Sequence, residues 1–334
     1  MGTRVTIYDV AREAGVSAST VSRALSRPGR VSLETASRVH EAMDALGYRP
    51  RVASFSGATS THLVLFAVPD IFFPIYRELV AGFTEAMKGA ELTPLYVESD
   101  ASRALEWEAL SRIVKTVDGL VVATSVLSSA QLVQLGKQRP LVLVHRAEKG
   151  IYSVTSDTAA GVDAVVDALK KRGHRSLTFI SGPESLWLSG VRWRLTQDAA
   201  ARGGLECRRI SAGVMDRDVG KRVFAAWSKH PTTAVFGYND GYAAAFLQEA
   251  ERQGVRVPED VSVVGIDSSR LTAATTPRLA SLNPSNWEIG RRAGTFMRFL
   301  LDHRSAAKPE NALVPMRLDM RESLGTAPHA DGTR

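Results

Sequence analysis

The 334-residue chain has a single cysteine, Cys207, and its apolar runs are too short to span a bilayer. A lone cysteine excludes an intrachain disulfide and a cysteine-based metal site, and it fits a reducing compartment. The amino-terminal segment also lacks the apolar stretch of a secretion signal. We therefore expect a cytoplasmic protein that makes no membrane contact.

Catalytic and nucleotide-binding motifs are missing too. The sequence has no Gly-x-x-x-x-Gly-Lys phosphate loop and no Gly-x-Gly-x-x-Gly after its first expected strand. Its histidines and its cysteine show no metal-ligand spacing. We therefore expect no cofactor, no metal and no enzymatic activity.

The charge of the chain is unevenly spread. Lys and Arg number 42 against 35 Asp and Glu, which gives a net charge of +7. Residues 1–60 contain eight Arg, no Lys and five acidic residues, so this stretch alone carries +3. A surplus of arginine suits a polyanionic partner such as nucleic acid.

Residues 6–25 predict a helix, a glycine turn and a second short helix. Thr6 and Asp9 form a capping-box pattern at the start of the first helix, and Gly15 suits the left-handed position that ends it. Ser17 caps the second helix. The expected buried faces of the two helices are Val10, Ala11, Ala14, Val21, Ala24 and Leu25.

The outer face of the second helix carries small and polar side chains, namely Ala18, Ser19, Ser22 and Arg23. Small residues let a helix approach the bases in the major groove of DNA, and Arg23 can bond a guanine at two points. Thr20 and Ser22 can bond backbone phosphates. A surface salt bridge is the alternative role for Arg23. Capping alone is the alternative for Ser17 and for Ser32, which begins a third expected helix.

This segment resembles the DNA-binding headpiece of the LacI/GalR family of bacterial transcription regulators. Its most specific stretch is Val16-Ser17-Ala18-Ser19-Thr20-Val21-Ser22-Arg23. The resemblance implies that Ala18, Ser19 and Arg23 set the operator preference. It also implies that the phosphates are held by Thr6, Ser17, Thr20, Ser22 and Ser32.

The following segment departs from the family pattern. After Pro50 the family usually has an asparagine and then a hinge helix with a leucine wedge, whereas here Arg51 replaces the asparagine and no leucine follows. Val52 and Ala53 fit a helix in the minor groove of DNA. Phe55 either replaces the wedge or packs against protein. We expect this weak helix to form only on DNA.

Beyond residue 61, apolar β-rich runs alternate with amphipathic stretches. The expected strands are 63–68, 93–97, 119–123, 141–144, 177–180, 234–236 and 261–265. The expected helices include 74–88, 104–116, 161–171 and 241–253. This alternation predicts an α/β core of doubly wound parallel sheets in two lobes, with a ligand cleft beyond the carboxyl ends of the strands.

The core also resembles that family and, through it, the periplasmic sugar-binding fold. The resemblance implies that the chain passes between the lobes near residues 157, 285 and 310. The expected domains are a headpiece (1–49), a hinge (50–61), a core (62–325) and a disordered tail (326–334). The first lobe would comprise 62–156 and 285–309, and the second 157–284 and 310–325.

By resemblance, the effector site would comprise Phe72, Phe73, Arg194, Phe236, Asn239, Asp240 and Asp267. Phe72 and Phe73 would stack on a sugar or base, or else belong to the core or a dimer surface. Asp267 and Asn239 follow strands and would bind the effector or cap the next segment. His145 stands where the family often has aspartate, and we expect it to be structural.

The sequence as a whole predicts a homodimeric DNA-binding regulator, in this family most often a repressor. Two headpieces would bind a pseudo-palindromic double-stranded operator in the bacterial nucleoid. A small-molecule effector, by default a sugar or polyol and otherwise a nucleobase, would bind between the lobes and control operator affinity. The alternatives are a solute-binding protein with the same core fold and, less favoured, an enzyme. The sign of the control is open.

Overall fold

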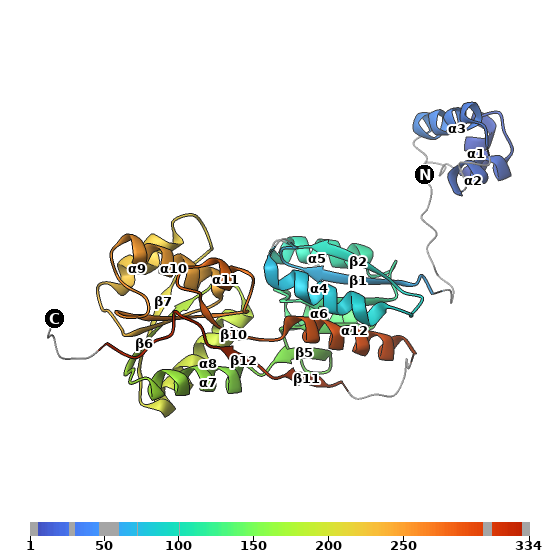
Figure 1. The fold of residues 1–334 in the computed structure, drawn as a ribbon. Coiled ribbons are helices and arrows are strands. Elements are labelled where there is room, and N and C mark those ends of the chain that lie inside the picture. The colour runs from blue at the N-terminus through green and yellow to red at the C-terminus, as the bar shows by residue number, and fades with distance from the viewer. Residues whose placement is uncertain are drawn as a thin grey trace. The chain divides into compact units, whose positions relative to one another are not determined.

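In a computed structural model, the chain separates into two compact units, Met1–Ala58 and Thr59–Arg334. The structure describes residues 6–26, 31–46, 60–71, 73–99, 101–302 and 309–328. The first unit consists of packed helices, and the second is an α/β structure with two sheets (Figure 1). Each unit has a core of its own.

The first unit contains α1 (Ile7–Glu13), α2 (Ala18–Ser26) and α3 (Leu33–Ala45). The side chains buried between these helices are Val10, Ala11, Ala14, Val21, Ala24, Val39 and Ala42. Gly15 follows α1 with a φ of 63°, in the left-handed region that favours glycine. The predicted helix–glycine turn–helix is therefore confirmed.

The first lobe of the second unit is built on a six-stranded sheet in the order β11-β5-β4-β3-β1-β2, with every pair parallel. Its strands are β1 (Leu63–Val68), β2 (Thr93–Glu98), β3 (Gly119–Ala123), β4 (Leu141–Val144), β5 (Tyr152–Ser156) and β11 (Asn311–Val314). The covering helices are α4 (Pro74–Met87), α5 (Arg103–Ile113), α6 (Ser129–Gly136) and α12 (Asn286–Asp302).

Strand β1 shows why the strands of this lobe have continuous apolar sequences. Val64, Phe66 and Val68 pack with α4 and α12 on one face of the sheet. Leu65 and Ala67 pack with α5 and α6 on the other face. Both faces of the strand are therefore buried, as expected for a parallel sheet between two helix layers.

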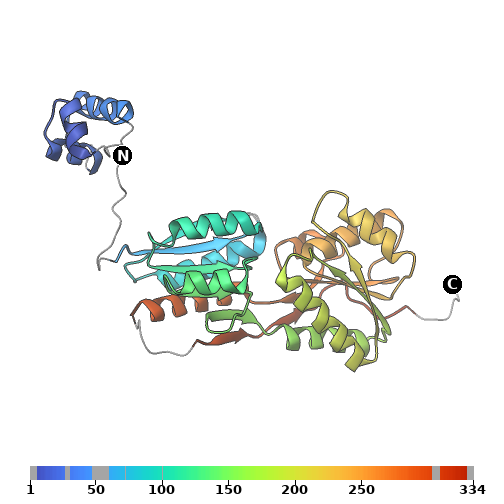
Figure 2. The same ribbon diagram turned by 180° about the vertical axis from the view of Figure 1, so that it is seen from behind.

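The second lobe has a sheet in the order β12-β10-β9-β8-β6-β7, parallel except for the β10–β12 pair. Its strands are β6 (Ser176–Ser181), β7 (Glu206–Ser211), β8 (Ala234–Gly237), β9 (Ser262–Ile266), β10 (Ala280–Asn283) and β12 (Arg317–Asp319). α7 (Thr158–Lys171) and α8 (Trp187–Gly203) lie together on one face of this sheet (Figure 2). The opposite face carries α9 (Val219–Trp227) and α10 (Asp240–Arg252), with the short α11 (Leu271–Ala274) nearby.

The chain passes between the lobes after Ser156, after Asn283 and after Val314. The first two passages lie where the sequence places them. The third passage was expected near residue 310 and lies later, because β11 pairs with β5 in the sheet of the first lobe. This corrects the assignment of residues 310–314 to the second lobe.

Helices α4 and α12 approach each other closely through two glycines. A Cβ on Gly82 of α4 would overlap the carbonyl oxygen of Trp287, and a Cβ on Gly290 of α12 would overlap that of Leu79. Backbone oxygens cannot rotate away as side chains can. The contact therefore requires glycine at both positions and joins the helices into one body, which we call the α4–α12 pair.

We expect Gly82→Ala and Gly290→Ala each to lower the free energy of unfolding by roughly 1–3 kcal/mol or more, because the added methyl meets backbone. Gly190→Ala is the matched control, since Gly190 is exposed in α8 and an added Cβ there meets nothing within 4 Å. The control should gain about 0.5–1 kcal/mol from lower backbone entropy. Urea unfolding followed by circular dichroism measures all three; equal stability of Gly82→Ala and wild type would contradict the requirement.

Candidate functional site

The amino end of α2 carries a cluster of hydroxyl groups. Ser17 Oγ accepts a hydrogen bond from the Thr20 backbone N–H at 3.1 Å, which caps the helix. The same oxygen lies 2.9 Å from Ser19 Oγ and 2.8 Å from Thr20 Oγ1. Ser19 is exposed, and Ala18 and Thr20 are half-buried. This end of α2 therefore presents small, hydrogen-bonding side chains to solvent.

Of the remaining residues predicted to contact DNA, the structure describes the surroundings of Thr6 and Ser32, and their contact with DNA stays a prediction. Thr6 begins α1, where its backbone N–H and hydroxyl both donate to Asp9 Oδ2 at 2.9 and 2.6 Å. Ser32 begins α3, where its Oγ accepts from the Thr35 N–H at 3.2 Å. Ser22 and Arg23 belong to α2, but their side chains lie outside the described part of the chain. Arg51, Ala53 and Phe55 lie outside the described residues.

In the second unit, polar residues follow directly after strands of both sheets. Thr124 follows β3 and His145 follows β4 in the first lobe, whereas Tyr238 follows β8 and Asp267 follows β9 in the second. Thr124, His145 and Asp267 have φ values of 51°, 58° and 107°. Residues other than glycine rarely adopt a positive φ. Residues that do so are often found at binding sites. These strand ends are therefore the candidate cleft.

Arg192 and Asp267 form a buried ion pair at these strand ends. Arg192 Nη2 lies 3.3 Å from Asp267 Oδ1, and both side chains are less than 5% exposed. Arg192 Nη1 also donates to the Tyr238 carbonyl oxygen at 2.6 Å, and the guanidinium lies 4.9 Å from the centre of the Tyr238 ring. Burial raises the pKa of Asp267, and the positive charge of Arg192 opposes this rise.

The first lobe contributes a second buried polar pair. His145 Nε2 lies 3.1 Å from Asn286 Oδ1, at the start of α12. Burial, together with the positive charge of Arg192, lowers the pKa of His145 to about 4. Arg192 also acts on the pKa of the buried Tyr76 hydroxyl, which burial raises. Arg192 of the second lobe is therefore close enough to His145 and Tyr76 of the first lobe to act on their pKa values.

Several buried polar atoms at these positions have no hydrogen-bond partner. Among the described residues, such atoms include Ser156 Oγ, Arg192 Nε and Asn286 Nδ2. Buried polar groups are almost always paired, so each exception calls for an explanation. Ser156 ends β5, Asn286 begins α12, and Arg192 bonds to Asp267. A small polar ligand between the lobes would supply the missing partners.

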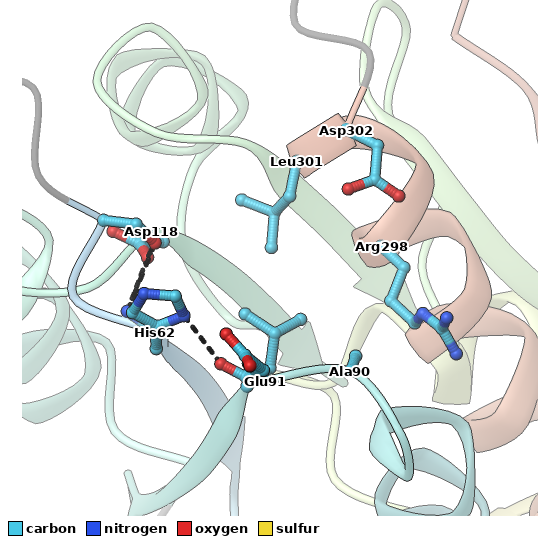
Figure 3. A pocket seen from close by; sticks show the side chains of 9 residues that line it. His62, Ala90, Glu91, Asp118, Arg298, Leu301 and Asp302 are labelled. Atoms are coloured by element: carbon cyan, nitrogen blue, oxygen red, sulfur yellow. Dashed lines mark hydrogen bonds between the residues drawn. The ribbon is translucent and has the colours of Figure 1, made fainter.

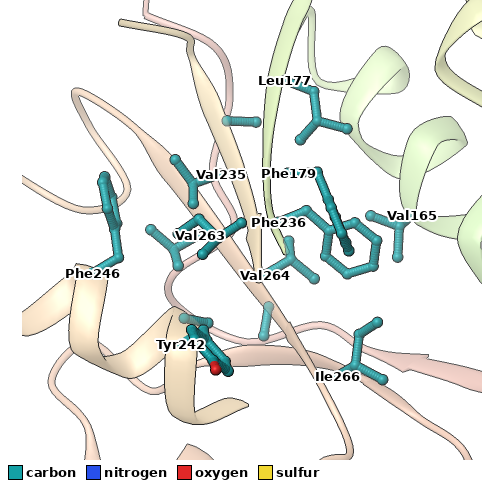
Figure 4. Close-up of a cluster of buried hydrophobic side chains, with 14 of the residues drawn as sticks. Val165, Leu177, Phe179, Val235, Phe236, Tyr242, Phe246, Val263, Val264 and Ile266 are labelled. Carbon is teal, nitrogen blue, oxygen red and sulfur yellow. The ribbon is translucent and has the colours of Figure 1, made fainter. Parts of the chain in front are cut away.

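Two predicted effector residues lie elsewhere and are corrected. Arg194 is exposed on α8, and Arg192, two positions earlier, is the arginine that pairs with Asp267. Phe236 is fully buried inside the second lobe, with its ring centre 5.7 Å from that of Phe179. Figure 4 shows it among Val165 and Phe179 in the apolar core, not on a cleft wall.

Asn239 and Asp240 bond within the second lobe. Asn239 caps α10 by accepting from the Tyr242 N–H at 3.2 Å. Asp240 accepts from the Ser269 N–H and from Ser281 Oγ, both at 2.6 Å. Burial raises the pKa of Asp240 to about 6. These contacts shape the strand ends beside Asp267.

Of the two aromatic residues predicted after β1, the structure describes only Phe73. Phe73 precedes α4, where it packs against the core of the first lobe with its ring centre 6.4 Å from that of Tyr76. Phe72 lies outside the described residues. Thr124, Arg192 and Asn286 were not predicted, although Thr124 directly follows a strand that the sequence located.

Two further features, a metal site and a membrane-spanning helix, were sought among the described residues. Nowhere among them do three or more His, Cys, Asp or Glu side chains gather in a way that could hold a metal ion. None of the helices in this part of the chain has the length and apolarity needed to cross a membrane.

Comparison with known proteins matches both units. The family model of bacterial regulatory proteins of the lacI family covers residues 6–51, and the model of the periplasmic binding protein-like domain covers residues 166–324. The HTH-type transcriptional repressor CytR of Escherichia coli (strain K12) is 30% identical over 309 residues, which are 90% of this chain and 90% of that protein.

Solved structures with this fold include a complex of the transcriptional regulator CelR with cellobiose, at 25% identity and a TM-score of 0.71, covering 96% of this chain and 100% of that one. The lac repressor dimer bound to operator and the anti-inducer ONPF has 22% identity and a TM-score of 0.72, covering 97% and 100%. With a repressor 30% identical along nine-tenths of the chain and a matching headpiece, the protein belongs to the lacI family of bacterial regulatory proteins, which regulate transcription by binding DNA.

Proposed function

We propose that the protein is a homodimeric transcriptional repressor whose operator affinity is set by an uncharged sugar or polyol bound between its lobes. The observation that carries the proposal is the set of buried polar atoms without a hydrogen-bond partner, Ser156 Oγ and Asn286 Nδ2 in the first lobe and Arg192 Nε in the second. A solved structure with this fold, that of the transcriptional regulator CelR, is a complex with cellobiose. The repressor role is supported by the similarity to CytR.

The charges at the cleft favour a neutral effector. Arg192 is already paired with Asp267, so little of its positive charge is left for an anion. His145 is neutral near pH 7, because burial lowers its pKa to about 4. The unmet groups Arg192 Nε and Asn286 Nδ2 are donors, and Ser156 Oγ can donate or accept. Sugar hydroxyl groups satisfy this set without bringing a charge into the cleft.

Control of DNA binding follows from the connections between the lobes. Three passages of the chain join the lobes, and such connections permit hinge closure around a ligand. The effector shifts operator affinity only to the extent that it binds one lobe arrangement better than the other. Two copies of the headpiece, related by two-fold symmetry, would read the two half-sites of a pseudo-palindromic operator.

In the headpiece, we propose that α2 enters the major groove. Ala18, Ser19 and Arg23 would face base edges, since small side chains allow close approach and arginine can bond guanine at two points. Thr6 and Ser32, with Ser17, Thr20 and Ser22, would bond phosphates. Arg51, Ala53 and Phe55 stay predictions for the minor groove. A solute-binding protein would explain the core but would leave this headpiece without a role.

The first prediction concerns the effector. Among D-ribose, cellobiose, D-sorbitol and glucose 6-phosphate, a neutral compound should raise the unfolding midpoint; one present at 100 times its Kd adds about 2.7 kcal/mol to stability. Asn286→Ala should remove this gain, because it deletes an unmet donor and the partner of His145. Glu108→Gln, an exposed change in α5, should keep it. Differential scanning calorimetry measures the shifts, and stabilisation by glucose 6-phosphate alone would refute a neutral effector.

The second prediction concerns Arg23. With a duplex selected from a random pool, Arg23→Ala should cost roughly 1–3 kcal/mol of binding free energy and relax the preference at one position per half-site. Arg38→Ala is the charge-matched control, since Arg38 is exposed on α3. The control should weaken all duplexes about equally. Fluorescence anisotropy at fixed salt distinguishes the two, and a uniform loss for Arg23→Ala would reduce Arg23 to a phosphate contact.

The third prediction concerns His145, whose pKa falls from its ordinary value of 6.5 to about 4 on folding. Between these pH values the unfolded chain binds a proton that the folded chain does not, so stability falls as the pH drops. His145→Gln removes this effect. The stability of wild type minus that of the variant should rise between about pH 4 and 6.5, by at most ~1.4 kcal/mol per pH unit, and then stay constant. Urea unfolding over this range measures it, and a pH-independent difference would contradict a neutral His145.

A further inference from the structure

The start of the core chain is fixed by one carboxylate. Asp118, which precedes β3, accepts hydrogen bonds from Ser60 Oγ at 2.5 Å and from Thr61 Oγ1 at 3.0 Å. It also accepts from the backbone N–H groups of Thr61 at 3.0 Å and His62 at 2.8 Å. Four bonds thus hold three consecutive residues. We call Asp118 with Ser60, Thr61 and His62 the Asp118 anchor.

His62 is fixed from a second side. Its backbone has a φ of 57°, a conformation that costs energy for any residue but glycine. Its ring Nδ1 lies 2.7 Å from the Glu91 carbonyl oxygen, and its own carbonyl oxygen accepts from the Thr93 N–H at 2.6 Å. Figure 3 shows the His62 ring between Asp118 and Glu91. The surrounding bonds therefore define this strained backbone completely.

The electrostatics agree with a permanent anchor. Burial alone would raise the pKa of Asp118, but the hydrogen bonds from Ser60, Thr61 and His62 outweigh it and lower the pKa below its usual value. The carboxylate is therefore charged at neutral pH, when it can accept all four bonds.

The anchor lies at the edge of the sheet opposite the cleft. Parallel strands β1, β2 and β3 all begin there, and their carboxyl ends point to the cleft. A pocket of about 430 Å³ at this edge is lined by His62 and Asp118 and, from α12, by Arg298 and Leu301 (Figure 3). The other end of the α4–α12 pair carries Tyr76 and Asn286. One rigid pair of helices thus reaches from the cleft to the anchor.

We propose that Asp118 is a positioning residue for operator recognition, because it fixes the point from which the preceding segment leaves the core and so sets the half-site spacing that a dimer accepts. The proposal rests on the proposed function. Two headpieces tethered from fixed points have a high effective concentration at one spacing and a low one at others. If residues 60–62 are released from Asp118, the headpieces can reach many more positions, and the preference for one half-site spacing weakens.

The test uses the full-length protein and does not require the effector. The duplex selected from a random pool is compared with the same duplex carrying one extra central base pair. For wild type, the extra base pair should raise the Kd roughly 100-fold, because one headpiece loses its half-site. Asp118→Asn keeps the size of the side chain but places an amide N–H₂ against donors. It should reduce this ratio to about tenfold or less.

A second readout separates positioning from general damage. Discrimination against a single base change within a half-site should stay as in wild type, since Asp118 touches no base. Glu108→Gln makes the same carboxylate-to-amide change on an exposed face of the same lobe and should leave both readouts unchanged. His62→Gly tolerates the left-handed backbone but loses the ring contact to Glu91, and it should give an intermediate ratio.

The outcomes are distinct. A folded Asp118→Asn protein with the wild-type spacing ratio overturns the proposal, and so does an equal loss of spacing and base discrimination. If Asp118→Asn does not fold, Ser60→Ala and Thr61→Val each remove one hydroxyl donor and decide by the same ratio. A wild-type chain without preference for any two-fold-symmetric duplex refutes the proposed function, and with it the anchor's role.

Discussion

The constraint on which the rest of this core depends is that both faces of each parallel sheet are covered by helices. The side chains of β1 alternate between two apolar clusters, so no position along the strand is free for a polar group. Only the strand ends are free. Thr124, His145, Tyr238 and Asp267 occupy such ends, and the positive charge of Arg192 in the second lobe acts on the pKa of His145 in the first. The cleft is therefore a consequence of how the sheets are covered.

The polar groups at these ends come at a cost in stability. A buried ion pair such as Arg192–Asp267 contributes little to folding, and the unpartnered Arg192 Nε and Asn286 Nδ2 oppose it. The backbone of His145 adds a strained φ. The apolar clusters on both faces of each sheet supply the offsetting stability. A chain that keeps so many unfavourable groups in one place is better explained by binding than by folding.

The sequence predicts the strands that are largely apolar and misses those that carry several polar side chains. All seven predicted strands are present, whereas five were missed, namely β5, β7, β10, β11 and β12. β7 is a sheet-edge strand whose Glu206 and Arg208 face solvent, and the other four are short runs interrupted by serine, threonine, asparagine or charged residues. Arg192 and Arg194 are both arginines of α8, and at 3.6 residues per turn they point about 200° apart. Only the packing of α8 on its sheet decides which one faces Asp267, and that is not visible in the chain itself.

The α4–α12 pair connects the cleft with the Asp118 anchor. Its glycine contact makes two helices from distant parts of the sequence move as one, with Asn286 at the cleft and Arg298 beside the anchor. A displacement at the cleft end cannot be absorbed by sliding between the helices, because backbone meets backbone there. It must move the lobe as a whole, including Asp118 and the residues bonded to it. The rigid packing of α4 against α12 would thus let a small ligand in the cleft act on the segment that leaves the core at the Asp118 anchor.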